Sequence, residues 1–279
     1  MPKRLSLKAI ERYREEGFYF PVRVMTLAEA TATRQKLEAA EAALSEKLKG
    51  AFRHKPHLLF TWLDAIVRHP VILDAVEDLI GPNLLCWSSL FFNKAPQSKT
   101  YVSWHQDATY WGLSSPDVVT AWVAFSPSTI EAGAMRVMPG THLRDQIPHR
   151  ETFAPDNLLT RGQEVAVEVD ERQAVDLVLA PGEMSLHHVK LVHGSSPNHS
   201  ADRRIGFAIR YIPPHVRQLV GRDSALLVRG VDDHGHFDLE RSPRADLDSE
   251  AVTLHAAVAE QHARILYAGT GRQDAKTLS

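Results

Sequence analysis

The fold class is decided by the stretch Arg204-Ile205-Gly206-Phe207-Ala208-Ile209-Arg210-Tyr211. Bulky apolar side chains alternate in it with arginines and small residues, and successive side chains of a β-strand point to opposite faces. The face with the isoleucines, phenylalanine and tyrosine is suited to a hydrophobic core. The other face begins with Arg204 and continues with small residues, which leaves room for a ligand beside the guanidinium.

Short apolar or alternating runs of this kind recur on both sides of the stretch, between turn residues such as Pro139-Gly140 and Pro181-Gly182. They cover residues 84–93, 118–125, 134–138, 165–169, 174–179, 184–188, 191–194 and 205–211. Runs of this length and spacing indicate a β-sandwich or barrel. The sequence therefore predicts a mainly β protein with its β core in residues 83–213.

The segments around the β core are predicted to be helical. Good helix formers and apolar stripes mark helices over residues 6–17, 26–49, 70–80 and 246–267. Residues 214–245 are polar and are predicted to be a loop that could act as a lid. We therefore expect one domain over residues 1–279, with a helical N-terminal part in 1–82, the β core in 83–213, and a loop and C-terminal helix in 214–279.

Composition narrows the partners and the compartment. The net charge is −2, from 32 basic and 34 acidic residues, so neither nucleic acid nor a membrane is expected as a partner. The single cysteine, Cys86, favours a reducing compartment, and residues 1–20 lack a signal-peptide pattern, so the expected location is cytoplasmic. Fifteen histidines is a large number for this length, and histidine is the commonest metal ligand.

Two short segments together predict a metal site. In Trp104-His105-Gln106-Asp107, His105 and Asp107 are two residues apart, so on an extended strand both would point to one face. His193 stands at the end of a second apolar strand. Two imidazoles and one carboxylate form the facial triad of non-haem Fe(II) oxygenases, which leaves three coordination positions open for a chelating 2-oxo acid and O₂.

Neighbouring residues compete for two of these roles. His187 and His188 could replace His193 as the third ligand, but only His193 is followed eleven residues later by an arginine, Arg204. A guanidinium binds a carboxylate bidentately and remains charged, so Arg204 suits the far carboxylate of the oxo acid. Arg203 competes with Arg204, but adjacent residues of a strand point in opposite directions, and Arg204 shares the face with the small residues.

At these positions the chain resembles the phytanoyl-CoA dioxygenase family. The matching stretches, in the family's order, are Trp104-His105-Gln106-Asp107, Ala121-Trp122, Met138-Pro139-Gly140-Thr141-His142, His193-Gly194-Ser195 and Arg204. The resemblance covers roughly residues 5–215, and residues 214–279 match nothing that we can place. It implies a double-stranded β-helix (jelly-roll, cupin-like) core flanked by N-terminal and C-terminal helices, with Fe(II), 2-oxoglutarate and O₂ as cofactor and co-substrates.

The resemblance also implies roles for individual residues. His105, Asp107 and His193 would bind iron, and Arg204 would bind the distal carboxylate of 2-oxoglutarate. Gln106, Trp122 and Ser195 match positions that line the co-substrate pocket in relatives, and no catalytic side chain is expected beyond the metal centre. Related halogenases have a small residue in place of the carboxylate, so Asp107 favours hydroxylation or another oxidation.

The substrate is expected to be a small molecule, and its identity does not follow from the family name. Tyr110, Trp111 and Arg210 are candidates for its pocket, and Arg210 makes an anionic group one option; packing in the core is the alternative for the two aromatic residues, and pairing with a buried acid for Arg210. Two other functions stay open. One is a metal-dependent cupin-like enzyme that does not use 2-oxoglutarate, and the other is a non-catalytic jelly-roll binding module.

Overall fold

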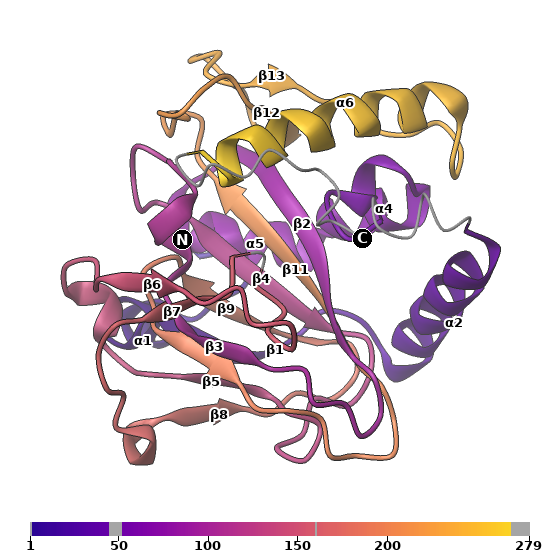
Figure 1. Cartoon of the computed structure of the whole chain (residues 1–279). Coiled ribbons are helices and arrows are strands. Elements are labelled where there is room, and N and C mark those ends of the chain that lie inside the picture. Colours follow the sequence, from indigo (N-terminus) through magenta and orange to yellow (C-terminus); the bar gives the residue numbers. More distant parts are fainter. Residues whose placement is uncertain (1, 45–51, 160, 269–279) are drawn as a thin grey trace.

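Two antiparallel sheets stack face to face in the computed structural model, which describes residues 2–44, 52–159 and 161–268 (Figure 1). The large sheet has the order β1-β9-β4-β11-β2-β12-β13, the smaller sheet has the order β3-β10-β5-β8, and β6 pairs with β7. The strands are β1 (Phe18–Arg23), β2 (Leu84–Lys94), β3 (Val102–His105), β4 (Val119–Ala124), β5 (Met135–Val137), β6 (His149–Glu151), β7 (Gln163–Val165), β8 (Val175–Leu177), β9 (Glu183–His188), β10 (His193–Ser195), β11 (Arg204–Ile212), β12 (Ser224–Arg229) and β13 (Asp238–Leu239). This arrangement is a jelly-roll core, as the sequence predicted.

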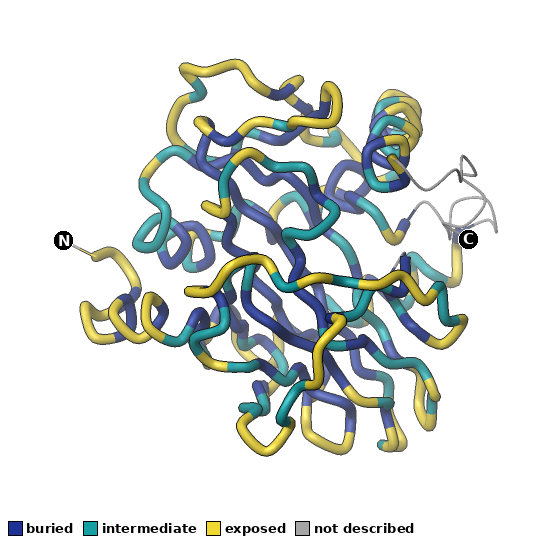
Figure 2. Tube along the Cα trace, turned by 60° about the vertical axis from the view of Figure 1, so that its left-hand side comes forward, coloured by how far each residue is buried: buried dark blue, intermediate teal, exposed yellow. Residues whose placement is uncertain are grey.

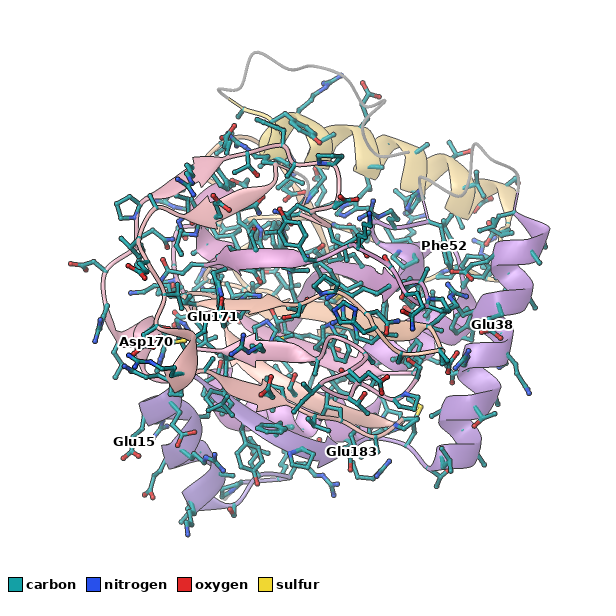
Figure 3. The ribbon with its side chains drawn as sticks, turned by 60° about the horizontal axis from the view of Figure 1, so that its bottom comes forward. Glu15, Glu38, Phe52, Asp170, Glu171 and Glu183 are labelled. Atoms are coloured by element: carbon teal, nitrogen blue, oxygen red, sulfur yellow. The ribbon has the colours of Figure 1, made fainter. Side chains whose placement is uncertain are left out.

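Helices cover the outside of the large sheet and the two flanks. They are α1 (Leu7–Glu16), α2 (Leu27–Ala43), α4 (Thr61–Val67), α5 (Pro70–Ile80) and α6 (Ser249–Leu266). Ser6 caps α1, Thr26 caps α2 in a capping box with Glu29, and Pro70 begins α5, so local sequence signals set these ends. In Figure 3, α1 and α2 lie on opposite sides of the sheets, and their acidic residues Glu15 and Glu38 are at the periphery.

Strand β11 confirms the two-faced pattern that predicted the fold. Ile205, Phe207, Ile209 and Tyr211 belong to a core formed with α4 and α5, in which the Tyr211 hydroxyl donates to the Val67 carbonyl at 2.8 Å. Ala208, on the opposite face, belongs to a second core between the two sheets. Figure 2 shows the strands as the buried interior, whereas the exposed residues gather on loops and on the outer faces of helices such as α1. Since buried residues cover both faces of β11, its register is strongly specified.

The structure differs from the sequence expectation in four places. The helical N-terminal part contains a strand, β1, which pairs with β9 at the edge of the large sheet, and the short helix α4 was not foreseen. The strand predicted for residues 165–169 is instead β7, which ends at Val165. The expected loop at 214–245 contains β12 and β13, which extend the large sheet. Residues 45–49 of the helix predicted for 26–49 lie outside the described residues.

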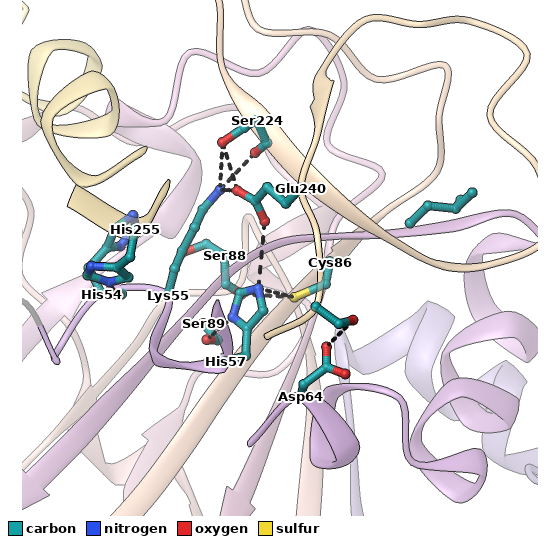
Figure 4. Close-up of polar contacts among 12 residues, drawn as sticks. His54, Lys55, His57, Asp64, Cys86, Ser88, Ser89, Ser224, Glu240 and His255 are labelled. Carbon is teal, nitrogen blue, oxygen red and sulfur yellow. Dashed lines mark hydrogen bonds and ion pairs between the residues drawn. The ribbon is translucent and has the colours of Figure 1, made fainter. Parts of the chain in front are cut away.

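A buried ion pair attaches this C-terminal addition to the core (Figure 4). Lys55 and Glu240 are both buried and are joined by an ion pair. The Lys55 ammonium also donates to the Ser224 carbonyl at 2.8 Å, and the Ser224 hydroxyl donates to Glu240 at 2.7 Å. The His57 imidazole lies 3.7 Å from the same carboxylate. None of the helices in the described part of the chain is both long and apolar enough to cross a membrane.

Replacing Glu240 by alanine should lower the free energy of unfolding by about 3–5 kcal/mol, because it leaves the buried Lys55 ammonium without its counter-charge. Asp238→Ala is the matched control, since Asp238 pairs with Arg222 at the surface and such pairs contribute about 0–1 kcal/mol. Urea unfolding of both variants measures the difference. Equal losses in the two variants would mean that the buried pair does not stabilise the fold.

Candidate metal centre

Three side chains from two strands of the smaller sheet and the turn after β3 converge on one point. His105, Asp107 and His193 are 1%, 6% and 6% exposed, and a possible ligand atom from each lies within 4.8 Å of the others. The His105 and His193 ring centroids are 4.1 Å apart, and the His105 Nε2 atom is 3.3 Å from the Asp107 carboxylate. Strand pairing explains the convergence, because His193 on β10 is directly opposite His105 on β3.

The route by which Asp107 reaches the site differs from the prediction. The sequence placed His105 and Asp107 on one extended strand, but β3 ends at His105 and Asp107 begins a short 3-10 turn over Asp107–Tyr110. Gln106 between them keeps an extended backbone, with φ −112° and ψ 130°. The side chains two residues apart therefore still meet, although the second of them is no longer in the strand.

Backbone carbonyls orient both imidazoles. The Nδ1–H of His105 donates to the carbonyls of Ser103 and His193, at 2.9 and 3.0 Å, and the Nδ1–H of His193 donates to the Leu191 carbonyl at 2.9 Å. A carbonyl can only accept, so each ring keeps its Nε2 lone pair free. The His105 Nε2 atom is buried without a hydrogen-bond partner among the described residues. A metal ion would satisfy it, so this donor set fits a divalent cation.

The charge states at the site also suit metal binding. Burial lowers the pKa of His193 well below its ordinary value, and the neighbouring His105 lowers it further, so His193 is a neutral ligand at pH 7. Burial alone would raise the pKa of Asp107, but the positive charge of the Arg210 guanidinium holds that pKa below its usual range. The site therefore presents one carboxylate, the neutral His193 imidazole and the unpaired Nε2 atom of His105, which is the facial-triad set.

A cavity of about 400 Å³, including space open to solvent, connects the three side chains to Arg204. Arg204 is 2% exposed, donates to the carbonyls of Gly133 and Phe92, and has a buried Nε atom without a partner among the described residues. Burial lowers its pKa to about 9, and no carboxylate of the described residues pairs with it. A buried guanidinium without a counter-charge fits the far carboxylate of a diacid.

Two further residues that the sequence predicted for the co-substrate pocket, Trp122 and Ser195, also line this cavity. The Arg204 guanidinium carbon is 5.4 Å from the Trp122 ring centroid. Gly206 makes that position possible, because a Cβ atom there would lie 1.8 Å from the Trp122 ring. Trp122 therefore forms a wall along the line between the metal ligands and Arg204.

Lys94 also belongs to this region, although no motif in the sequence points to it. A lysine at the end of an apolar run is usually solvated, but Lys94 is fully buried opposite Arg204 of β11. Its amino nitrogen lies 2.6 Å from the Ser195 hydroxyl and also donates to the Ser196 carbonyl, which holds Ser195 at the wall of the cavity. Burial, followed by repulsion from Arg204, lowers the pKa of Lys94 to about 6, so it is largely neutral at pH 7.

Gln106 does not line the cavity, contrary to the prediction. Its amide nitrogen donates to the Lys190 carbonyl at 2.7 Å. Its amide oxygen accepts from the Gln146 side chain and from the Ile147 backbone, both at 2.8 Å. On an extended backbone Gln106 points away from the face shared by His105 and Asp107, so it fastens the segment after Met138 instead of touching a ligand.

The structure distinguishes His193 and Arg204 from the neighbouring histidines and arginine that competed for their roles. His187 lines the metal cavity, with its ring centroid 4.9 Å from that of His193, but it lies outside the three-residue ligand cluster. The His188 ring accepts from the Lys190 backbone and faces His142. Arg203 points to the surface and pairs with Glu41 at 2.8 Å.

Tyr110, Trp111 and Arg210 line a second cavity that adjoins the first one. Arg210 lines both cavities, and its guanidinium carbon lies 4.3 Å from the centroid of the Trp111 ring. Tyr110 is covered by the Arg161 guanidinium at 4.0 Å. The three candidate substrate residues therefore gather beside the metal centre and outside the space between the metal ligands and Arg204.

Comparisons with known proteins agree with this geometry. The family model described as phytanoyl-CoA dioxygenase matches residues 13–206. A "probable alpha-ketoglutarate-dependent hypophosphite dioxygenase" of Stutzerimonas stutzeri is 32% identical over 60% of this chain and 58% of its own length. A "probable phytanoyl-CoA dioxygenase" of Caenorhabditis elegans is 25% identical over 68% of this chain and 63% of its own length. The chain thus matches less than two thirds of the length of these curated relatives.

Solved structures match over more of the chain. The apo form of the non-haem monooxygenase ThoJ superposes with a TM-score of 0.83 at 40% identity and covers 92% of this chain and 97% of ThoJ. CytC3 with Fe(II) and 2-oxoglutarate gives a TM-score of 0.66 at 27% identity, over 88% of this chain and 97% of CytC3.

The jelly-roll fold and the His-Asp-His site define the class of non-haem iron- and 2-oxoglutarate-dependent oxygenases. Within that class, the chain belongs to the phytanoyl-CoA dioxygenase family, as the motifs in the sequence implied.

Proposed function

We propose that this protein is an Fe(II)- and 2-oxoglutarate-dependent dioxygenase that hydroxylates, or otherwise oxidises, a C–H bond of a small molecule. His105, Asp107 and His193 hold the ferrous ion, and Arg204 binds the far carboxylate of 2-oxoglutarate. The observation that carries the proposal is the single cavity that contains both the three-ligand cluster and a buried guanidinium without a counter-charge. A metal enzyme without an oxo-acid co-substrate would leave Arg204 unexplained.

The ion and its co-substrates supply the oxidation: one atom of O₂ enters the substrate as a hydroxyl group and the other enters succinate as CO₂ leaves. The residues of the chain supply position and environment. Backbone carbonyls fix the two imidazoles, the cavity between the sheets excludes bulk water, and Ser195 and Trp122 border the space beside Arg204. Asp107 occupies the third ligand position, which favours hydroxylation over halogenation.

We further propose that residues 1–279 fold as one domain. The main core joins Leu5 near the N-terminus to Val228 on β12, and it includes residues of β2, β4, β9 and β11. The ion pair between Lys55 and Glu240 ties the C-terminal strands to the same unit. A shared core of this kind supports a single cooperative unfolding transition.

Calorimetric titration of 2-oxoglutarate tests the function without knowledge of the substrate. The protein loaded with Ni(II) should bind 2-oxoglutarate, the metal-free protein should bind it much more weakly, and Fe(II) with O₂ should then convert it to succinate. Metal binding without 2-oxoglutarate binding would favour a cupin-like enzyme of another kind. A protein that binds no metal would be a jelly-roll binding module.

A further inference from the structure

The second cavity is large enough for a substrate and opens beside the metal centre. It encloses about 1520 Å³, including space open to solvent, and it shares Phe92, Asp107 and Arg210 with the cavity of the metal site. Part of its wall is α6, through His262, Ala263 and other residues. This helix lies beyond residue 206, where the family match ends. The cavity thus joins the metal centre to a wall formed by a helix outside the family match.

Arg210 stands at the junction of the two cavities, where the charge of Asp107 acts on it but no acceptor among the described residues forms a hydrogen bond with its guanidinium. It is 8% exposed, and among the described residues no hydrogen bond or ion pair of its guanidinium is found, while its Nε atom is buried and unsatisfied. Its contact is the Trp111 ring at 4.3 Å. Burying a cation without hydrogen bonds costs desolvation free energy, and native structures normally provide it with a counter-charge or with hydrogen bonds. A ligand that carries an anion would remove this cost.

The other charged residues that line the second cavity neither provide Arg210 with a lasting counter-charge nor remain free to bind an anion. Asp107 is the single acid among its lining residues, and a bound dication would neutralise it. Arg161 is paired with Glu151, and Arg53 donates to the Leu158 carbonyl at 3.4 Å. Arg210 is therefore the cation of this cavity that is left for a ligand.

The remaining wall is aromatic and uncharged. His54 and His262 stack with ring centroids 4.1 Å apart, and burial lowers the pKa of both, so they are neutral at pH 7. Trp87 packs against His262 at 5.4 Å and against Trp111 at 5.0 Å. Flat apolar surfaces of this kind accept planar or bulky apolar groups.

We propose, building on the oxygenase function above, that the substrate carries an oxyanion, either a carboxylate or a phosphorus oxyanion, attached to an aromatic or similarly bulky apolar body. Arg210 binds the oxyanion, and the aromatic wall with α6 receives the body. Since Arg210 also lines the metal cavity, the C–H bond that is oxidised lies close to the oxyanion in the substrate. The identity of the body is set by residues of α6.

Three probes test this assignment on the protein loaded with Ni(II) and 2-oxoglutarate: phenylacetate, phenylphosphonate and the neutral phenylacetamide. Quenching of tryptophan fluorescence reports binding, because Trp87 and Trp111 line the cavity. At least one acid should bind roughly tenfold or more tightly than the amide. The stronger of the two acids identifies which oxyanion the site prefers.

Variants of Arg210 provide the second part of this binding test. Arg210→Met should lose roughly tenfold or more in affinity for the acid and leave the amide unchanged, while Arg210→Lys should recover part of the loss. Arg53→Met, in the wall of the same cavity, is the matched control and should change the affinity less than about threefold. If Arg210→Met does not fold, the comparison of acid and amide in the unaltered protein still decides.

The proposal is overturned if acid and amide bind equally, if no probe binds, or if Arg210→Met affects 2-oxoglutarate instead of the acids. Failure of the oxygenase function looks different, because then the unaltered protein would not bind Ni(II) or 2-oxoglutarate at all. Intact metal and 2-oxoglutarate binding without oxyanion selectivity would reject the role of Arg210 alone.

Discussion

Replacement of His105 by alanine is expected to abolish binding of a divalent metal at neutral pH. The substitution removes one of three buried ligands, so that only the His193 imidazole and the Asp107 carboxylate remain to coordinate a metal ion. Loss of a residue that merely orients a ligand already costs about 10–100-fold in metal affinity, so the loss here should exceed about 100-fold. Titration calorimetry with Ni(II) measures it.

His187→Gln is the matched control for this experiment. His187 is buried in the same cavity, 4.9 Å from His193 between ring centroids, but it is not one of the three clustered ligands. Its replacement should leave Ni(II) affinity within about tenfold, because it alters the surroundings of the ligands and not their number. Thermal unfolding gives a second readout, since a saturating metal at about 100 times its Kd stabilises the fold by about 2.7 kcal/mol. If metal stabilised the His105→Ala variant as much as the unaltered protein, the ligand assignment would be wrong.

Replacement of Arg204 by methionine is expected to weaken 2-oxoglutarate binding roughly 30-fold or more while Ni(II) binding stays intact. Removing one partner of a buried, hydrogen-bonded charge pair costs about 2–5 kcal/mol, and each 1.4 kcal/mol is tenfold in affinity. Methionine keeps most of the volume, so Trp122 should retain its support. Calorimetric titration of 2-oxoglutarate into the Ni(II)-loaded variant measures the loss.

Arg203→Met provides the comparison, because Arg203 is the adjacent arginine but points to the surface and pairs with Glu41. Its affinity for 2-oxoglutarate should match that of the unaltered protein. Equal behaviour of the two variants would contradict the role of Arg204. A loss of Ni(II) binding in the Arg204 variant would instead mean that this arginine supports the metal ligands.

Much of the site could be predicted because its residues come from short, regular segments. Strand alternation assigned Arg204 to the face with small residues, and the structure places it in the cavity with His105, Asp107 and His193. Alternation says nothing about a neighbouring strand, however. The burial of Lys94 therefore cannot be read from its own strand, because the groups that enclose it, Gly133, Ser195 and Ser196, come from other segments.

Other residues were misplaced because contacts between distant segments decide them. Gln106 looked like a pocket residue beside two ligands, but Gln146 and Ile147, forty residues later in the chain, hold its side chain elsewhere. Residues 214–245 are polar along most of their length, so their composition favoured a loop. Within them, however, the apolar run Ala225-Leu226-Leu227-Val228 was a local strand signal, and it pairs with the edge of β2 as β12.

Local sequence specifies the face that β11 buries, the first residues of α1, α2 and α5, and the set of residues able to hold a metal and a dicarboxylate. These properties depend on backbone periodicity and side-chain chemistry, which are local. Packing between distant segments decides that His193 lies opposite His105, that Lys94 is buried beside Arg204, and that the Arg210 Nε atom is buried without a hydrogen bond among the described residues. Strand order and packing bring these groups together. The free energy of burial depends on which distant segments meet, and the order of residues within a single segment does not specify that.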